Sequence, residues 1–327
     1  MRLIFGDRIS EPLEQRFQPY SLGLQMSADS YINSRRFSGR GEFALGKRTY
    51  VMGIINVSPE SFSGDAVTDV EAAVAQGIRM VEEGADILDV GGESTRPAVS
   101  ATVEAKVSGA IPGKGATALP VEVEAHRVIP VIRRLAQEVA VPISVDTYKS
   151  QVARQSIEAG ATIINDVWGL KADADLARVA AEHDVPIVLT HNQANTEYED
   201  LMADITTSLK TSIELAIDAG VGHHRIILDP GFGFGKLPVY NLELLRRLAE
   251  LKPLGYPILM GTSRKSTIGQ VLGLPVNERV EGTAATIAIA ISNGADIIRV
   301  HDVKAMVRVA RMTDAIVRGW PSEPADM

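Results

Sequence analysis

Carboxylates, amides and cations stand at the ends of short apolar runs in this chain, where they could bind a small polar ligand. Eight runs show the pattern, namely VMGIIN, ADILDV, PISVDT, ATIIND, PIVLTH, RIILDP, YPILMG and ADIIRVH. Their polar ends are Asn56, Asp89, Asp146, Asn165, His191, Asp229, the turn 261–265, and Arg299 with His301. Carboxylate and amide oxygens accept N–H bonds, whereas arginine and lysine bind anions such as phosphate. The pattern therefore indicates an enzyme that acts on a small molecule.

Each apolar run has the length of a strand, and most are followed by a helix-like stretch. We expect strands at 51–56, 87–90, 143–145, 163–165, 187–189, 226–228, 258–260 and 297–300. We expect helices at 70–83, 122–138, 149–159, 174–183, 205–219, 241–251, just after 264, at 282–292 and at 303–318. This eightfold alternation predicts an α/β protein of the (β/α)8 TIM-barrel class, with its active site at the C-terminal ends of the strands. Glycines stand just past four of these helices, and Gly84, Gly160, Gly220 and Gly294 suit the left-handed conformation that ends a helix.

Three segments depart from the repeating pattern. Residues 1–42 predict an N-terminal extension that packs on the barrel or stays partly mobile, before a barrel at 43–319 and a tail at 320–327. The segment FALGKRTY predicts a hairpin arm over the bottom of the barrel. The polar loop after Asn56 suits a mobile lid. The second βα loop, which contains AVSATVEAKVSGAIPGKGATALPVEVE, is enlarged beyond the usual length of about two to six residues. Within the helix at 122–138, Pro130 predicts a kink or break.

Composition limits the class of protein. The 327 residues are 45% hydrophobic and 23% charged, as in globular proteins. A formal net charge of -8 argues against a nucleic-acid-binding surface, although local Arg and Lys side chains can still bind an anion. The absence of cysteine excludes disulfides and thiolate catalysis. With no apolar stretch of about 20 residues and no secretory signal pattern at the start, we expect a cytoplasmic protein.

Seven motifs follow one another at the spacing of barrel strands: MGIINVSPESFS, DVGGESTRP, SVDTYK, IINDVWG, LDPGFGFGK, GTSRKS and RVHDV. As an ordered set over residues 43–318, they resemble the dihydropteroate synthase family of pterin-binding barrels. The resemblance implies a folate-pathway transferase that joins 6-hydroxymethyl-7,8-dihydropterin diphosphate to p-aminobenzoate. The products would be 7,8-dihydropteroate and pyrophosphate. It also implies an SN1-like reaction, in which the bond to the diphosphate breaks before the aniline nitrogen attacks.

The resemblance implies a pterin site made of residues at the strand ends. The residues concerned are Asp89, Asp146, Asn165, Asp229 and Lys265. A pterin edge alternates donors and acceptors, so carboxylates and an amide complement it, and a buried Asp would stabilise positive charge on the ring. The alternative for Asp146, Asn165 and Asp229 is that they cap the helices that follow them.

The resemblance also implies a diphosphate site made of Asn56, Arg299 and His301. Mg2+ would bind to the diphosphate with help from Asn56, because hard cations prefer oxygen ligands and phosphates. For Arg299 the alternative is a salt bridge at the rim with Asp302 or Asp296. For His301, taken without its motif, the alternative is a structural histidine.

The p-aminobenzoate site that the resemblance implies contains Thr95, Arg96, Phe234 and Ser266. The alternative for Phe234 is an aromatic residue of the core. Sulfonamides, as mimics of p-aminobenzoate, should compete for this pocket. The residues implied in catalysis are Asp65, Asp146, Lys265, Arg299 and His301.

This chain differs from the family pattern in three places. Asp65 stands one position later than the expected acid, the second loop is longer, and Thr190 replaces a methionine that lines the pterin pocket. The altered first loop keeps open a non-catalytic pterin-binding paralogue. A methyltetrahydrofolate-dependent methyltransferase would share the Asp and Asn ends without needing the SRK turn or the Arg–His pair. The family commonly forms homodimers, with which the apolar outer faces of helices 282–292 and 303–318 are compatible.

Overall fold

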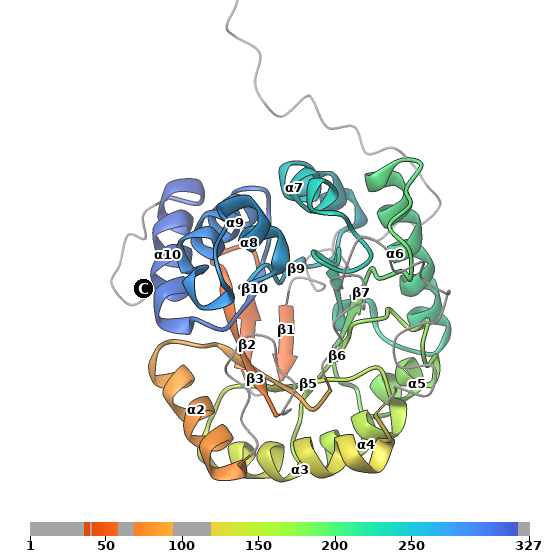
Figure 1. Cartoon of the computed structure of the whole chain (residues 1–327). Helices are drawn as coiled ribbons and strands as arrows, with labels where there is room; N and C mark the ends of the chain where they lie inside the picture. Colours follow the sequence, from red (N-terminus) through yellow and green to blue (C-terminus); the bar gives the residue numbers. More distant parts are fainter. Residues whose placement is uncertain (1–35, 40, 58–68, 94–118, 320–327) are drawn as a thin grey trace, which may run out of the picture.

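The computed structural model of the chain describes residues 36–39, 41–57, 69–93 and 119–319. Within these ranges, eight strands pair in the order β8-β7-β6-β5-β4-β3-β10-β9, all parallel. They are β3 (Tyr50–Asn56), β4 (Ile87–Gly91), β5 (Ile143–Asp146), β6 (Ile163–Asp166), β7 (Ile187–Thr190), β8 (Ile226–Asp229), β9 (Leu259–Met260) and β10 (Ile297–Val300). An isolated backbone bridge between Leu228 and Ile258 joins β8 to β9 and closes the ring. The predicted barrel is therefore confirmed (Figure 1).

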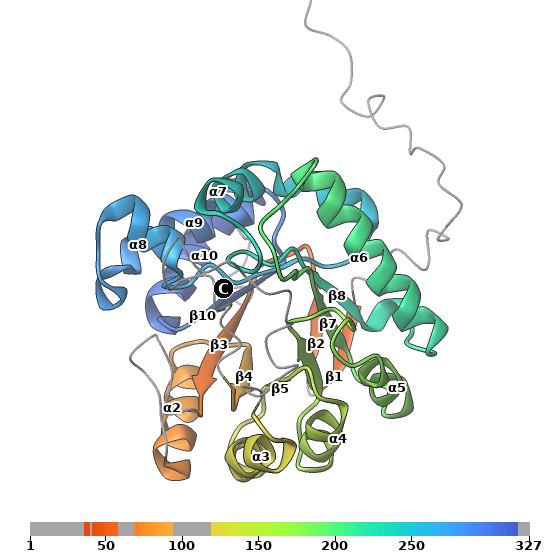
Figure 2. The ribbon, with the colours of Figure 1, turned by 45° about the vertical axis from the view of Figure 1, so that its right-hand side comes forward.

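Helices form an outer layer around the ring of strands (Figure 2). They are α2 (Val70–Glu82), α3 (Val121–Glu138), α4 (Ser150–Glu158), α5 (Asp175–Glu182), α6 (Leu201–Asp218), α7 (Pro238–Arg247), α8 (Ser266–Leu272), α9 (Val280–Ser292) and α10 (Val303–Val317). Short 3-10 helices are η3 (His223–Arg225), η4 (Leu248–Leu254) and η5 (Val276–Glu278). Positive φ angles confirm the predicted helix ends at Gly84, Gly160, Gly220 and Gly294. No helix in the described ranges has the length and apolarity that crossing a membrane requires.

Two helices begin three or more residues before their predicted first residues. α6 starts at Leu201 rather than 205, because the carboxylate of Asp200 caps it. That carboxylate accepts bonds from the backbone N–H groups of Met202 and Ala203, both at 3.0 Å. α7 starts at Pro238 rather than 241, since proline has no N–H to satisfy and its fixed φ suits the first turn of a helix. In both cases the cap lies ahead of the amphipathic pattern used to predict the helix.

The predicted break at Pro130 is absent, because α3 continues through it. A proline inside a helix removes one backbone hydrogen bond. The surrounding apolar face keeps the helix packed on the barrel, and its fully buried members are Val128, Val131, Ile132 and Leu135. Burial of each such side chain contributes about 1.5–3 kcal/mol, which together outweighs the roughly 3 kcal/mol that the proline costs.

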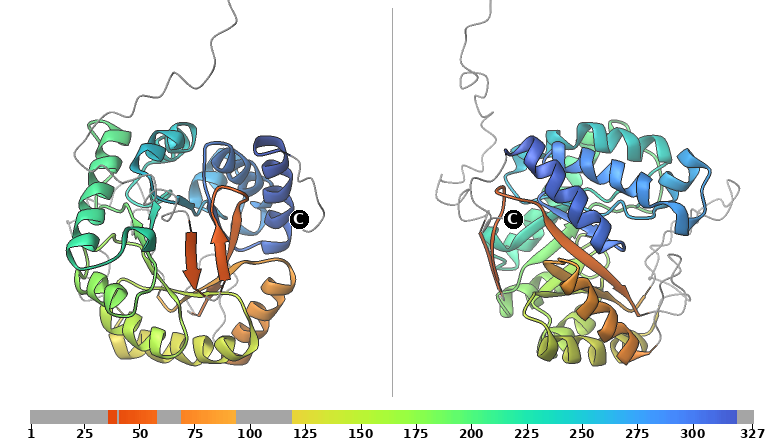
Figure 3. Two further views of the ribbon diagram at one scale, coloured as in Figure 1. Left: turned by 180° about the vertical axis from the view of Figure 1, so that it is seen from behind. Right: turned by 90° about the vertical axis from the view of Figure 1, so that its left-hand side faces the viewer.

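An antiparallel hairpin of β1 (Arg36–Gly39) and β2 (Gly41–Ala44) lies across one end of the barrel (Figure 3). Phe43 and Leu45 are buried there, and the Phe43 ring packs edge-on against Tyr50 with centroids 4.6 Å apart. They form one cluster with residues near the starts of the barrel strands: Met52, Ile87, Ile163, Val188, Ile227, Leu259 and Ile297. The predicted arm therefore covers the N-terminal end of the strands, although its hairpin lies mainly upstream of FALGKRTY. The opposite end is left for the polar residues.

Candidate active site

Four of the predicted residues meet inside the C-terminal end of the barrel. The Nε of Arg299 donates to Oδ2 of Asp89, and its Nη2 donates to Oδ2 of Asp146, both at 2.6 Å. The amide Nδ2 of Asn165 also donates to Oδ2 of Asp89, at 3.1 Å. These residues come from β10, β4, β5 and β6, so the barrel brings together positions up to 210 residues apart. The strand ends therefore form one connected polar cluster.

Three oxygens of this cluster have no hydrogen-bond partner among the described residues. They are Oδ1 of Asp89, Oδ1 of Asp146 and Oδ1 of Asn165, and all three are buried. A buried acceptor left unpaired costs about 1–3 kcal/mol, so native proteins keep such atoms for a ligand, a water or an ion. A ligand with several adjacent N–H groups would satisfy them. This is the edge that a pterin presents.

The helix-cap alternative does not hold for Asp146. α4 begins with Lys149 as its N-cap residue and has no side-chain cap bond, while the N–H of Ser150 donates to Asp173 at 2.9 Å. Asp229 differs, because its Oδ1 accepts the backbone N–H of Gly231 at 2.7 Å and so also supports its own turn. The Asp146 side chain is thus available to a ligand, and the Asp229 side chain is available through its other oxygen.

Burial has strong effects on the charges of this cluster. It raises the pKa of Asp146 to about 7, against the opposing attraction of Arg299 and with a further contribution from Asp89. Desolvation acts to lower the pKa of Arg299, but the two carboxylates outweigh it and the net shift is upward. Arg299 therefore remains a cation. One of its carboxylate partners can exchange a proton near neutral pH.

The rim salt bridge proposed as the alternative for Arg299 is wrong. Asp302 instead pairs with Arg264, whose Nε and Nη2 donate to it at 2.9 and 2.6 Å. Asp296 accepts the backbone N–H of Ile258 at 3.1 Å. The structure places Arg299 against the predicted pterin carboxylates, and its predicted contact with a diphosphate stays a prediction.

Lys265 lies beside the turn that follows β8. Its Nζ donates to the backbone carbonyl of Phe232 and stands 4.4 Å from the ring centroid of Phe234. Burial lowers the pKa of Lys265 to about 8, although Asp229 acts to raise it. Phe232 is the fully buried aromatic residue of this turn, whereas Phe234 is half-buried. Phe234 packs partly against the buried cluster of Tyr148, Val167 and Trp168 and also lies beside a cation.

Three other predicted residues lie at or after the C-terminal ends of the neighbouring strands β3, β9 and β10. Ser266 is the first residue of α8, directly after Lys265. The Nδ1 of His301 lies 2.9 Å from Oγ of Ser263. Asn56 ends β3, which pairs with both β4 and β10, so it stands beside the strands that carry Asp89 and Arg299. The predicted shared ligand of Asn56 and His301 is the diphosphate.

The three places where this chain differs from the family pattern lie in the first two loops and at the end of the fifth barrel strand, β7. Asp65, Thr95 and Arg96 lie outside the described residues. Thr190, at the end of β7, is buried, and its Oγ1 has no partner among the described residues. The described residues contain no group of three or more His, Asp or Glu side chains that could hold a metal ion. Asn56 alone is therefore too small a ligand set for a resident metal, but it suits a cation that arrives with phosphate oxygens.

Two ionic groups near the site were missed from the sequence. Lys236 and His191 form a buried pair beneath the turn that follows β8, with Nζ 2.8 Å from Nδ1. Lys149 donates to Glu93 at 2.6 Å and to Glu124 at 2.5 Å. Both lysines stand within motifs, GFGFGK and SVDTYK, but nothing in their spacing reveals their partners. The available signal in the sequence was the position of Lys236 directly after three closely spaced glycines.

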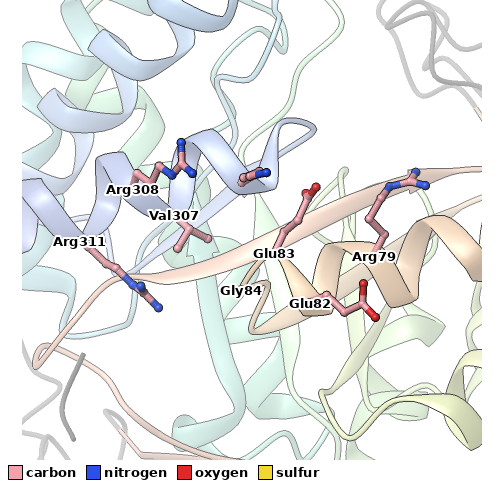
Figure 4. A pocket seen from close by; sticks show the side chains of 8 residues that line it. Arg79, Glu82, Glu83, Gly84, Val307, Arg308 and Arg311 are labelled. Carbon is pink, nitrogen blue, oxygen red and sulfur yellow. The ribbon is translucent and has the colours of Figure 1, made fainter. Parts of the chain in front are cut away.

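A hollow of about 440 Å³ lies elsewhere, on the outer wall between α2 and α10 (Figure 4). Its side chains are mainly charged, and none belongs to the strand-end cluster. The hollow is lined by Arg79, Glu82, Glu83, Gly84, Lys304, Val307, Arg308 and Arg311. Because a (β/α)8 barrel carries its chemistry at the strand ends, the polar cluster is the better candidate site.

Known proteins are similar to this chain in both sequence and fold. The model of a family described as pterin binding enzyme matches residues 52–301. The dihydropteroate synthase of Clostridium beijerinckii is 51% identical over 282 residues, which cover 86% of this chain and 98% of that protein. A Yersinia pestis dihydropteroate synthase in a sulfonamide drug complex is 37% identical, with a TM-score of 0.78, 87% of this chain covered and 100% of that one. A Xanthomonas albilineans dihydropteroate synthase in complex with 7,8-dihydropteroate is 41% identical, with a TM-score of 0.70 and coverages of 84% and 94%.

Proposed function

Since this chain belongs to the pterin binding enzyme family and resembles its dihydropteroate synthases along almost their whole length, we propose how its barrel performs their reaction. The chain is a transferase that condenses 6-hydroxymethyl-7,8-dihydropterin diphosphate with p-aminobenzoate to give 7,8-dihydropteroate and pyrophosphate, a step of folate biosynthesis. The observation that carries this assignment is the set of buried oxygens on Asp89, Asp146 and Asn165, beside Arg299, that have no partner among the described residues.

The pterin would bind at these oxygens. Its amino and ring N–H groups donate to the carboxylates, while the amide of Asn165 can both donate and accept. The negative charge of Asp146, held in a buried site, would also stabilise the positive charge that develops when the C–O bond breaks. The protein thereby favours an SN1-like transition state over the bound substrate, which is what accelerates the step.

The p-aminobenzoate would bind beside Phe234 and Lys265, which are in contact with each other. The half-buried Phe234 ring offers a face to the benzoate ring, and the nearby ammonium of Lys265 supplies positive charge. Ser266, which follows Lys265, would meet the carboxylate. Two rings held in this orientation place the aniline nitrogen near the reactive carbon of the pterin, and this proximity replaces a bimolecular encounter. Sulfonamides would compete for this pocket, as the Yersinia pestis complex suggests.

The diphosphate would lie toward Asn56 and His301, with Arg299 between it and the pterin. Mg2+ would arrive with the diphosphate and neutralise the charge of the leaving group, with the amide oxygen of Asn56 as a protein ligand. Asn56 and His301 end adjacent strands, which positions the leaving group on one side of the barrel mouth. Departing pyrophosphate therefore moves away from the ring site where the aniline attacks.

Pyrophosphate release is the direct test. The purified chain should release pyrophosphate only with the dihydropterin diphosphate, p-aminobenzoate and Mg2+ all present, and EDTA should stop it. Omission of each component in turn provides the controls. Binding of pteroic acid without any release would instead support the non-catalytic paralogue. Release that does not need p-aminobenzoate would contradict the proposed condensation.

We further propose that the chain forms a homodimer in the cytoplasm. Three apolar side chains on α9 and α10 are exposed, Ile289 at 49%, Met312 at 61% and Ile316 at 70%. Exposed apolar groups on neighbouring helices favour association. Sedimentation should give twice the chain mass for the wild type and the chain mass for Ile316→Asp. The matched control is Leu215→Asp on α6, which should remain dimeric, and an unchanged Ile316→Asp dimer would argue against this interface. Cell fractionation would test the location.

A further inference from the structure

A lysine is buried beneath the turn that joins β8 to α7. Lys236 is only 7% exposed, yet it forms no ion pair with any carboxylate of the described residues. Its Nζ lies 2.8 Å from Nδ1 of His191, 3.0 Å from the carbonyl of Gly231 and 3.1 Å from the carbonyl of Phe234. An ammonium group has three donors, and these three acceptors use all of them. Burial lowers the pKa of Lys236 well below its ordinary value, while these bonds and the nearby charge of Asp229 favour its protonated form.

The turn cannot hold its shape by steric restriction alone. Gly231, Gly233 and Gly235 all have positive φ, at 73°, 82° and 53°. Glycine leaves the backbone free in both halves of φ space, so such a segment needs external contacts to select one conformation. Lys236 supplies two of them, because it bonds the carbonyls of residues 231 and 234 on the same side of the turn.

Burial lowers the pKa of the histidine partner, His191, well below its ordinary value, which favours a neutral ring. For Nδ1 of His191 to accept from an ammonium, its proton must be on Nε2 and the ring must be neutral. The backbone N–H of His191 donates to the carbonyl of Asp229 at 2.8 Å. His191 thus connects the end of β7 to the start of the turn through its backbone and to the end of the turn through Lys236.

Both predicted ring sites depend on this turn. Asp229, a predicted pterin ligand, stands at its start, and Phe234, the predicted wall of the p-aminobenzoate site, stands near its end. The carbonyl of Phe232 between them accepts the bond from Lys265. Lys236 therefore contacts the turn on its buried side, while Lys265 contacts it on the side where the substrates are predicted to bind.

We propose that Lys236, held by neutral His191, is a positioning residue that fixes Asp229 and Phe234 in register for the two substrates. This role rests on the proposed function, since it concerns the same pair of ring sites. It acts through the turn, without contact to either substrate. Displacement of a binding group by about 1 Å can cost a hundredfold in rate, so loss of the lysine should weaken both sites.

Lys236→Met tests the proposal, because methionine keeps the length of the side chain and removes its three donors. We expect the affinities for pteroic acid and for p-aminobenzoate, measured by calorimetry, to fall at least about tenfold. The matched control is Lys171→Met. Lys171 also bonds a backbone carbonyl, but this residue is exposed, and its Nζ donates to the carbonyl of Asn192 and to Ser208 rather than to the turn. This control should lose stability without losing ligand affinity.

The outcomes separate the two proposals. Pteroic acid that fails to bind the wild type contradicts the proposed function, whereas a folded Lys236→Met protein with wild-type affinities overturns the positioning role alone. A pair of His191 variants covers the case in which Lys236→Met does not fold. His191→Asn places an acceptor near the position of Nδ1 and should keep the affinities, while His191→Leu should lower them several-fold. Wild-type affinities in His191→Leu would likewise overturn the role of the pair.

Discussion

Asp146 makes ligand binding depend on pH. Burial raises its pKa to about 7, and only the ionised form offers all its lone pairs to the N–H groups of a pterin. The affinity for pteroic acid should therefore rise as the pH is raised through about 7. In Asp146→Asn that rise should disappear and the affinity should be lower by roughly ten- to a hundredfold, since one or two charge-assisted bonds are lost. Calorimetry across this pH range is the measurement.

The same carboxyl group has the opposite effect on stability. Its folded-state pKa lies above the ordinary value of 3.8, so the folded chain binds more protons than the unfolded chain between these two values. The free energy of unfolding contributed by Asp146 therefore falls as pH rises from about 4 to about 7. Asp166, whose pKa burial raises to about 6, acts in the same direction. Urea unfolding of Asp146→Asn should show a reduced slope with pH, and an unchanged slope would refute the assignment.

Arg299 compensates two buried carboxylates at once. Its side chain is 18% exposed, while those of Asp89 and Asp146 are 0% and 9% exposed. Arg299→Met should lower the free energy of unfolding by about 3–5 kcal/mol, because it leaves negative charge buried without a partner. The double variant Arg299→Met, Asp146→Asn should recover part of that loss, since one carboxylate is neutralised. Equal stability of the single and double variants in urea would contradict this coupling.

Two glycines in turns distinguish backbone strain from steric exclusion. Gly231 and Gly273 have similar φ angles, 73° and 68°. A Cβ on Gly231 would lie 1.8 Å from the carbonyl oxygen of His191, whereas a Cβ on Gly273 would meet nothing within 4 Å. Gly273→Ala should cost about 1–2 kcal/mol, the price of the left-handed conformation. Gly231→Ala should lower the free energy of unfolding by clearly more and should abolish p-aminobenzoate binding. Urea unfolding and calorimetry together would test this. Equal losses of stability in the two variants would contradict it.

The barrel strands could be predicted from the sequence to within one residue, because each is a short, mainly apolar run with a polar residue at or near its end. Helix starts were less predictable where a cap preceded the amphipathic pattern, as at Asp200. Asp89, Asp146, Asn165 and Arg299 were all predicted for the site, but their pairing was not. That Arg299 bonds Asp89 depends on the closure of the barrel, which no local pattern encodes. The pair of Lys236 and His191, 45 residues apart, was missed for the same reason.

At the scale of the whole molecule, stability and chemistry occupy opposite ends of the barrel. Phe43 and Leu45 close the N-terminal end with an apolar cluster, and the polar atoms of Asp89, Asp146 and Asn165 that lack a partner within the described ranges lie at the other end. The helices between them present a continuous outer layer. This separation explains how the fold tolerates unsatisfied buried groups, because the apolar clusters stabilise the chain independently of the site.

The closure of the ring between β8 and β9 has a consequence for its motion. β9 has two residues, and Leu228 and Ile258 form the isolated bridge across this seam. The turn that contains Phe234 follows β8 on one side of this junction, and Lys265 follows β9 on the other side. The amides of β9 should exchange with deuterium faster than that of the equally buried Val145 on β5, because fewer ladder bonds must break for a local opening. Bound pteroic acid would contact both sides of this junction, so it should slow amide exchange most in β9. An equal slowing of exchange in all the barrel strands would contradict this. Ligand binding at the predicted p-aminobenzoate pocket would then itself hold β8 and β9 together.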